Sequence, residues 1–263
     1  MRQRLSVVML VALIVLLGVS TAEGTEAPVS SLTDPVDDDY GPGTYVYPTN
    51  SVFFPGAFDI VKFEVYKEAD EARFEITLAK PIANPWGGPN GVSVEMFHIY
   101  VDSEKSSGFA ECVPGANVAF AEDSLWDKAV LCEGGWGTEV EDIMAGLVDD
   151  EMRSCIHVAK KASVVGNTIR IWVPLSWLGT PSPGWGYQVL LMGQEGSKDV
   201  MDGIKVRRVL RERTEWQFGG SDESGYHPNV LDMLTKPGVD QRAILSSYSK
   251  DKDTFAIVSH VYP

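Results

Sequence analysis

Alternating apolar and polar residues, the pattern of a strand with one buried face, recur along the chain after residue 33. The alternation is cleanest over 72–78, which together with 58–67 and a turn at 68–71 predicts a β-hairpin. Further strands are predicted at 92–101, 117–121, 126–132, 153–159, 168–174, 186–193 and 254–261. Short helices or helical turns are predicted at 139–150, 174–178 and 229–234.

Glycine and proline separate the predicted strands, and neither an internal repeat nor a long linker interrupts them. Many short strands joined by such turns are typical of an all-β fold. We therefore expect a single-domain antiparallel β-sandwich, of jelly-roll or immunoglobulin-like type, with a few short helices.

The beginning of the chain does not follow this pattern. A basic start, an apolar run over 5–19 and small residues at 20–22 predict a secretory signal peptide over residues 1–22. An uncleaved anchor is the alternative, but this run is short for a membrane span, which needs about 20 residues. Residues 23–33 are interpreted as a polar, weakly ordered leader and 34–263 as the folded module. We expect a secreted, extracellular protein, free or associated with the cell surface, with no membrane span in the mature chain.

Composition and charge narrow the choice of partners. The chain has 263 residues, 44% of them hydrophobic, which is enough for one large β-domain with its own core. Its net charge is −15, and loss of Arg2 and Arg4 with the signal peptide would make it −17. Such a charge repels nucleic acid and anionic membranes, so we expect neither as a partner.

The chain contains three cysteines, Cys112, Cys132 and Cys155. In an exported protein they allow one disulfide and leave one thiol over. The pairs Cys112–Cys132 and Cys132–Cys155 are both consistent with the sequence. The cysteines are too far apart in the sequence for a zinc ribbon or a c-type haem attachment.

A dense group of carboxylates stands at the start of the module, where Asp34 and the run 37–39 place four aspartates within six residues. Crowded carboxylates repel one another, so they are either spread in water, as in an ordinary acidic turn, or neutralised by a cation. Hard oxygen ligands on a loop bent by glycine and proline suit Ca²⁺. The spacing is not that of an EF-hand loop.

More distant aspartates complete the calcium hypothesis. Asp59 follows a Pro-Gly turn and is expected to return to the acidic loop, and Asp102 ends a predicted strand. We predict Asp37, Asp39 and Asp59 as the main ligands, with Asp34 and Asp102 next.

Tryptophans provide a second signal, since the chain has seven of them. Sugar rings present apolar faces that stack on aromatic side chains, while their hydroxyls bond to nearby amides and carboxylates. Trp86, Trp136 and Trp185 stand in glycine-rich segments that favour exposed loops, and Asn84 and Asn90 flank Trp86. We predict a ligand site from these five residues, with a lid over the core as the alternative role of each tryptophan. The tryptophans that we assign to the core are Trp126, Trp172 and Trp177.

Several sequence blocks occur in a characteristic order along the mature chain. They lie at 34–43, 45–48, 53–60, 84–86, 99–102, 218–220 and 228–232, and include Asn84-Pro85-Trp86 and Ile99-Tyr100-Val101-Asp102. In this order they resemble the C-terminal binding module of glucodextranase, a family similar in fold to family 9 carbohydrate-binding modules and DOMON domains. The resemblance implies a sandwich fold, a secreted or cell-surface location, bound calcium and carbohydrate binding. The catalytic domain of glucodextranase has no counterpart in the chain.

We therefore expect a non-catalytic carbohydrate-binding module with structural calcium, which binds an α-glucan or a cell-surface glycan. A secreted glycoside hydrolase or the cell-surface layer is expected as a further partner. The first alternative is a calcium-stabilised structural or surface-layer-associated subunit. The second is a b-type haem electron-transfer domain, with ligands drawn from Met96, His98, His157 and Met192.

An enzyme is not expected. The chain contains neither a Gly-x-Ser-x-Gly nor a His-Glu-x-x-His motif, and it lacks a phosphate-binding loop. Carboxylate pairs such as Glu139 and Glu141 imitate those of glycosidases, but sequence spacing alone does not set the required separation in space.

Overall fold

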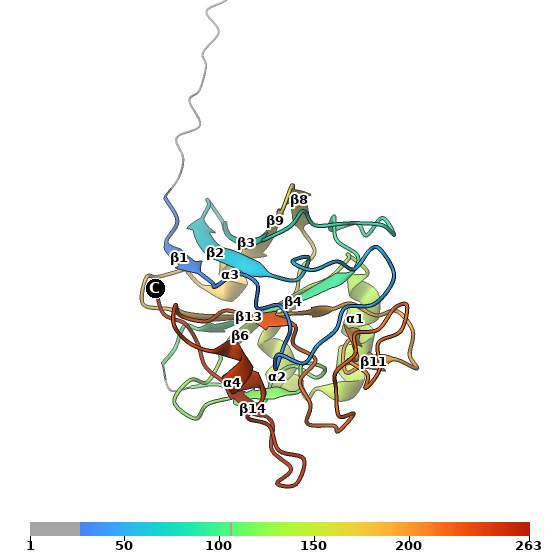
Figure 1. The fold of residues 1–263 in the computed structure, drawn as a ribbon. Helices are drawn as coiled ribbons and strands as arrows, with labels where there is room; N and C mark the ends of the chain where they lie inside the picture. The colour runs from blue at the N-terminus through green and yellow to red at the C-terminus, as the bar shows by residue number, and fades with distance from the viewer. Residues whose placement is uncertain (1–26, 106) are drawn as a thin grey trace, which may run out of the picture.

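A computed structural model describes residues 27–105 and 107–263, whose strands form two five-stranded sheets packed face to face (Figure 1). The first sheet is antiparallel throughout and has the order β1-β2-β3-β9-β8. Its strands are β1 (Ser30–Thr33), β2 (Ile60–Lys67), β3 (Glu71–Leu78), β8 (Ala162–Val165) and β9 (Thr168–Pro174).

The second sheet has the order β13-β10-β4-β6-β7, in which β6 and β7 pair parallel and the other neighbours antiparallel. Its strands are β4 (Glu95–Asp102), β6 (Lys128–Cys132), β7 (Ile156–Val158), β10 (Gly186–Gly193) and β13 (Asp232–Met233). Strands β1 and β13 are therefore edge strands of different sheets, which matters for the acidic cluster described below.

Short elements cover the second sheet on the side away from the first sheet (Figure 1). They include two strand pairs, antiparallel β11 (Met201–Asp202) with β12 (Val206–Arg207) and parallel β5 (Val118–Phe120) with β14 (Ala256–Val258). The helices on this side are α1 (Gly137–Leu147), α2 (Asp150–Ser154) and α4 (Gln241–Leu245). A fourth helix, α3 (Leu175–Leu178), follows β9 and packs beside the first sheet.

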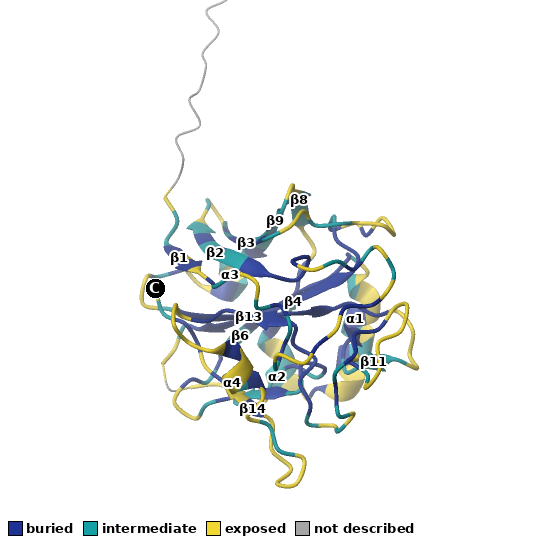
Figure 2. Ribbon diagram, viewed as in Figure 1, coloured by how far each residue is buried: buried dark blue, intermediate teal, exposed yellow. Residues whose placement is uncertain are grey.

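The main core lies between the two sheets. Phe63 of β2 and Tyr187 of β10 meet there with ring centroids 5.3 Å apart, and both side chains are fully buried. A second core lies on the opposite side of the second sheet, where Met96 and Leu190 pack with Val140 of α1. Because β4 and β10 are covered on both faces, every one of their residues is buried (Figure 2).

The structure confirms the predicted all-β sandwich and its leading hairpin, in which β2 and β3 pair with Phe63 opposite Ile76. The predicted helical turn over 229–234 is wrong, since Asp232–Met233 form strand β13. Backbone bonds to β10 override the local pattern here, because Leu231 donates to Leu191 at 2.9 Å. Residues 30–33, which were predicted to belong to the polar leader, form β1 and pair with β2.

The predicted disulfide does not form, because all three cysteines are free in the structure. Cys132 packs in the core between the sheets, whereas Cys112 and Cys155 pack against the second core. The second sheet thus separates Cys132 from both of its predicted partners.

The signal peptide predicted at 1–22 lies outside the described residues. Within 27–105 and 107–263, none of the helices has the length and apolar character that crossing a membrane requires.

Candidate functional site

An acidic cluster joins the edge strands of the two sheets. Asp34 follows β1, Asp38 stands in the next loop, and Asp232 begins β13. Each of the three offers a carboxylate oxygen, and these oxygens all lie within 4.8 Å of one another. An arrangement of oxygen atoms alone is the type of ligand set that a hard cation prefers.

Some oxygens of the cluster are already engaged by the fold. Asp34 Oδ1 accepts hydrogen bonds from the backbone N–H of Thr235 at 2.5 Å and from its hydroxyl at 3.2 Å. Asp232 accepts from the N–H groups of Ile60 at 2.5 Å and of Met233 at 2.8 Å. These bonds fix the direction of both carboxylates and connect the two sheets at this edge.

Other oxygens of the cluster are buried and unpaired. Asp34 Oδ2, Asp38 Oδ1 and Asp59 Oδ1 have no hydrogen-bond partner among the described residues. A buried carboxylate oxygen without a partner is costly, and a proton or a cation would relieve that cost.

The charges of the cluster act against one another. Burial and the neighbouring aspartates raise the pKa of Asp38 to about 6 and that of Asp59 to about 7. Burial likewise raises the pKa of Asp34 and of Asp232 above the ordinary range. Several ionised carboxylates in one partly buried site are therefore unfavourable unless a cation neutralises them.

The structure brings some of the predicted metal ligands together and separates others. Asp59 lies beside the cluster and accepts the backbone N–H of Asp37 at 2.8 Å, whereas the side chain of Asp37 is exposed. Asp39 is buried, but its Oδ2 already accepts hydrogen bonds from Gly56 N–H at 2.9 Å and from the Tyr47 hydroxyl.

Asp102 lies far from the cluster. In the second sheet Asp102 is opposite Gly186, while Asp232 is opposite Leu191. Five positions along β10, from 186 to 191, correspond to about 17 Å. Asp102 instead accepts a hydrogen bond from the Tyr262 hydroxyl.

A second candidate site is an open cavity of about 670 Å³, which has tryptophans on its walls. Trp86 comes from the β3–β4 loop, Trp136 directly precedes α1, and Trp216 lies between β12 and β13. Their exposed fractions are 47%, 37% and 36%, and the remaining tryptophans, all within the described residues, are buried or half-buried. The fold thus gathers its exposed indoles around one hollow.

Local contacts hold these tryptophans in place. The Asn84 side chain closes the Trp86 loop, because it accepts Gly88 N–H at 2.7 Å and donates to Gly88 O at 2.9 Å. Asn90 is buried and donates to Glu133 O at 3.0 Å. Trp136 folds back over Gly134, where an added Cβ would lie 2.3 Å from the indole. Both asparagines therefore support the cavity wall and do not line it.

Polar side chains line the cavity between the tryptophans. Gln194 and Ser93 belong to the lining, and two ion pairs, Glu139–Lys205 and Glu195–Arg207, add charge of both signs. Apolar ring platforms surrounded by hydrogen-bonding groups are what a polyhydroxylated ring requires.

Trp185, the third tryptophan predicted to bind a ligand, lies outside this cavity. It is half-buried against the main core, near Gly179. Trp126 is fully buried, as predicted, and Trp177 is half-buried against the main core. The assignment of Trp172 to the core is wrong, because its half-buried side chain packs against the charged residues Glu68 and Lys161.

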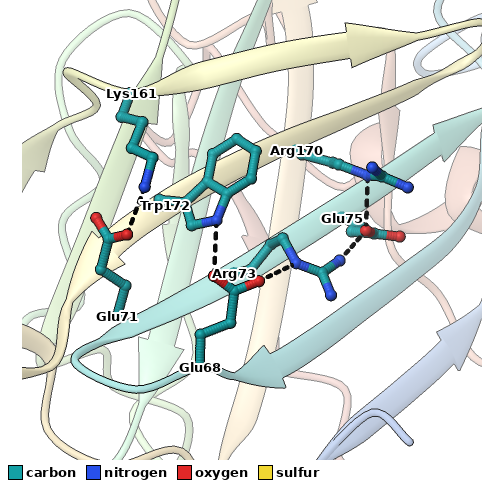
Figure 3. Close-up of polar contacts among 7 residues, drawn as sticks. All are labelled: Glu68, Glu71, Arg73, Glu75, Lys161, Arg170 and Trp172. Carbon is teal, nitrogen blue, oxygen red and sulfur yellow. Dashed lines mark hydrogen bonds and ion pairs between the residues drawn. The ribbon is translucent and has the colours of Figure 1, made fainter. Parts of the chain in front are cut away.

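Among the described residues no helix covers the outer face of the first sheet, where the Trp172 side chain is engaged by its neighbours (Figure 3). Trp172 donates its Nε1 to Glu68 at 3.0 Å, and the Lys161 ammonium lies 4.9 Å from the centre of its indole ring. Lys161 is also 2.5 Å from Glu71. The residues drawn in this network are Glu68, Glu71, Arg73, Glu75, Lys161, Arg170 and Trp172. The charged groups on this face are therefore paired with one another.

The four residues considered as haem ligands do not surround a common pocket: three are packed in strands β4 and β10, and the fourth lies on β7. Met96 and Met192 are opposite each other in β4 and β10, and both are fully buried with His98. Burial lowers the pKa of His98 to about 3. His157 is on β7, with its ring 5.1 Å from that of Trp177. This arrangement favours a filled core over a haem pocket.

Sequence reasoning missed several residues of both sites. Asp38 lies in the acidic run that was recognised, and Asp232 ends the last of the sequence blocks, so a signal existed for each. Trp216 stands in a polar run without glycine or proline, and nothing local marks Lys205 as a neighbour of Trp136.

Two stacked sheets with a closed acidic cluster at one edge and an open aromatic cavity define a β-sandwich of the ligand-binding kind. A family model described as the C-terminal, SLH-like binding module of glucodextranase matches residues 29–261. The chain therefore belongs to this family, which is a binding module rather than a catalytic domain. A search among curated proteins finds no significant match to the chain.

Proposed function

We propose that the protein is a secreted, non-catalytic carbohydrate-binding module whose cavity holds sugar rings. The observation that carries the proposal is the convergence of Trp86, Trp136 and Trp216 on one hollow of about 670 Å³. This volume lies within the range of small-ligand sites, about 300–1,000 Å³. Exposed indoles cost free energy in water, so their gathering at one place is best explained by a ligand that covers them.

We further propose that the acidic cluster holds a structural Ca²⁺. The ion would be held by the carboxylate of Asp232 and by the unpaired oxygens of Asp34, Asp38 and Asp59. The ion would neutralise the crowded charges and tie β1 to β13, which stabilises the folded domain.

The partner that this proposal implies is a neutral polysaccharide such as an α-glucan, or a glycan of the cell surface. A secreted glycoside hydrolase would be a natural companion, because the matching family is a module of glucodextranase. The formal charge of −15 suits neither nucleic acid nor an anionic membrane as a partner. The superfamily relation to family 9 carbohydrate-binding modules and DOMON domains remains a prediction.

The experiment that tests the proposal is affinity electrophoresis of the mature protein through gels containing dextran, soluble starch or cell-wall polysaccharide. Runs with calcium and with a chelator separate the role of the ion from that of the cavity. We expect retardation in at least one gel, reduced by Trp86→Ala and Trp216→Ala.

A folded protein that migrates unchanged in every gel would contradict carbohydrate binding. The alternative is a calcium-stabilised structural subunit, which the SLH-like description of the family favours. Calcium-dependent assembly into ordered polymers, seen by light scattering and electron microscopy, would identify that role.

A further inference from the structure

An ion pair lies in the wall of the tryptophan cavity. Lys205 Nζ is 2.5 Å from Glu139 Oε2. Lys205 stands in the turn between β11 and β12, and Glu139 belongs to the first turn of α1. The Lys205 side chain is 5% exposed, whereas that of Glu139 is 55% exposed, so the pair joins the floor of the cavity to its rim.

The backbone at Lys205 is unusual. Its φ of 56° lies in the left-handed region, which a residue with a Cβ adopts at a cost of about 1 kcal/mol. This conformation directs a buried ammonium toward Glu139 and places it 5.7 Å from the centre of the Trp136 ring. An indole platform, a charged donor and a carboxylate acceptor therefore lie side by side.

The other ion pair of the cavity is engaged mainly within the fold. Arg207 Nη1 is 2.7 Å from Glu195 Oε2 and donates to Trp216 O at 2.6 Å. Glu195 Oε2 also accepts from Gln217 at 3.0 Å, and its Oε1 accepts two backbone N–H groups at 2.9 Å each. The pair holds the wall together, and its carboxylate has little capacity left to accept from a ligand, whereas Arg207 Nε has no hydrogen-bond partner among the described residues.

The Lys205–Glu139 pair, by contrast, has capacity to spare. An ammonium group carries three donors, and among the described residues Glu139 is the hydrogen-bond partner of Lys205. The second oxygen of Glu139 accepts no hydrogen bond within the same part of the chain. The pair thus offers a free donor and a free acceptor next to each other.

We propose that Lys205 and Glu139 determine the sugar specificity of this cavity by binding two adjacent hydroxyl groups of a neutral pyranose. One hydroxyl accepts from the Lys205 ammonium, and its neighbour donates to the free oxygen of Glu139. The face of the same ring rests on Trp136. This inference rests on the proposed function, and it names the class of ligand, a neutral glycan with free vicinal hydroxyls.

The charge balance of the cavity selects against acidic sugars. The lining carries two carboxylates, Glu139 and Glu195, and two cations, Lys205 and Arg207. A uronate would therefore bring its carboxylate against Glu139 without an unpaired cation to receive it.

The test measures affinity for dextran, for soluble starch, for polygalacturonate and for dextran cleaved with periodate and then reduced. Periodate cleaves the carbon–carbon bond between vicinal hydroxyl groups and opens the ring, and reduction of the resulting aldehydes to alcohols leaves the polymer uncharged. We expect the wild type to bind at least one neutral glucan, and to bind polygalacturonate and cleaved dextran at least tenfold more weakly. Glu139→Gln and Lys205→Met should each weaken binding of the neutral glucan about tenfold, the effect of one charge-assisted hydrogen bond.

The chain supplies a matched control on the outer sheet face. Lys161 and Glu71 form an ion pair with the same 2.5 Å separation, next to Trp172 (Figure 3). Lys161→Met and Glu71→Gln should leave glucan affinity unchanged. If Lys205→Met fails to fold, Glu139→Gln carries the test, because its side chain is more than half exposed.

The possible outcomes separate this inference from the proposed function. Wild-type affinity in folded Glu139→Gln, together with loss of binding in Trp216→Ala, would overturn the role of the ion pair and leave carbohydrate binding in place. Binding of polygalacturonate as tight as that of the neutral glucan that the wild type binds would overturn the selection for neutral sugars. A wild type that binds none of the polymers would overturn the proposed function and this inference together.

Discussion

The indole rings of Trp86 and Trp216 lie 6.1 Å apart with their planes inclined by 49°. Trp216 is supported from behind by Phe53, whose ring centroid is 6.4 Å away at an angle of 79°. Phe53 in turn packs against the guanidinium of Arg207 at 5.0 Å. This side of the cavity is therefore held by the fold before a ligand arrives, which lowers the entropy cost of binding.

This relationship predicts that Trp216→Ala weakens binding of a neutral glucan about tenfold or more. Removal of the indole takes away one stacking platform and leaves Trp86 without its aromatic neighbour. Because Trp216 is 36% exposed, the loss of stability should stay below about 2 kcal/mol. Isothermal titration with dextran or starch gives the affinity, and thermal unfolding gives the stability.

The control for that experiment is Trp185→Ala. Trp185 stands in a similar Pro/Gly-rich segment but lies outside the cavity, so its removal should change stability and not affinity. Equal losses of affinity in the two variants would show that the cavity is not the binding site.

The acidic cluster predicts a calcium-dependent stability. If the ion binds the folded state alone, a hundredfold excess of Ca²⁺ over Kd adds about 2.7 kcal/mol. For a domain of this size the gain corresponds to a rise in Tm of roughly 5–10 °C. Chelator should reverse it, as differential scanning calorimetry would show.

Substitutions distinguish the cluster from the other aspartates. Asp38→Asn should reduce the rise in Tm produced by calcium, and it should not destabilise the metal-free protein, because it removes one of several repelling charges. Asp102→Asn should leave the calcium effect unchanged, since Asp102 lies far along the sheet. The reverse pattern would move the metal site to Asp102.

The strands were the part of the fold that could be predicted most clearly from the sequence. Residues 72–78 alternate because one face of β3 packs in the core, whereas the other carries the polar side chains of Arg73, Glu75 and Thr77. The second core was not predicted, because β4 and β10 are buried on both faces and so do not alternate.

The sites could be predicted only in part. A run of aspartates does not reveal which side chain turns inward. Here the backbone of Asp37 is in the left-handed region, with φ of 65°, so that its side chain is exposed and that of Asp38 joins the cluster. Asp232 joins them through pairing of β13 with β10, a long-range contact. Trp86 and Trp136 were recognised from their glycine-rich settings, but Trp216 reaches the cavity only through the tertiary fold.

The free cysteines predict that reductant does not affect stability. Cys132 is buried between the sheets, where burial also raises the pKa of its thiol, while Cys112 and Cys155 lie on the other side of the second sheet. We expect the same Tm with and without dithiothreitol, and three free thiols after unfolding in denaturant. A lower Tm in reductant would show that two of the three cysteines form a disulfide in solution.

Glu95 predicts a dependence of stability on pH that is separate from the metal site. Both of its carboxyl oxygens are buried without a partner among the described residues, and burial raises its pKa from 4.5 to about 8. Between these two pH values the folded protein therefore keeps the proton on Glu95, whereas the unfolded chain loses it. The stabilising contribution is complete below about pH 4.5 and is lost as the pH rises toward 8, by up to about 1.4 kcal/mol per pH unit.

Glu95→Gln removes this titration while preserving the shape of the side chain. Urea unfolding at pH 5 and at pH 7.5, with saturating calcium in every sample, compares the variant with the wild type. We expect the wild type to lose stability relative to Glu95→Gln at the higher pH. The buried Glu95 carboxyl must then either keep its proton or carry a charge, whereas a glutamine does neither. Parallel pH profiles for the two proteins would mean that the Glu95 carboxylate finds a compensating partner when it ionises.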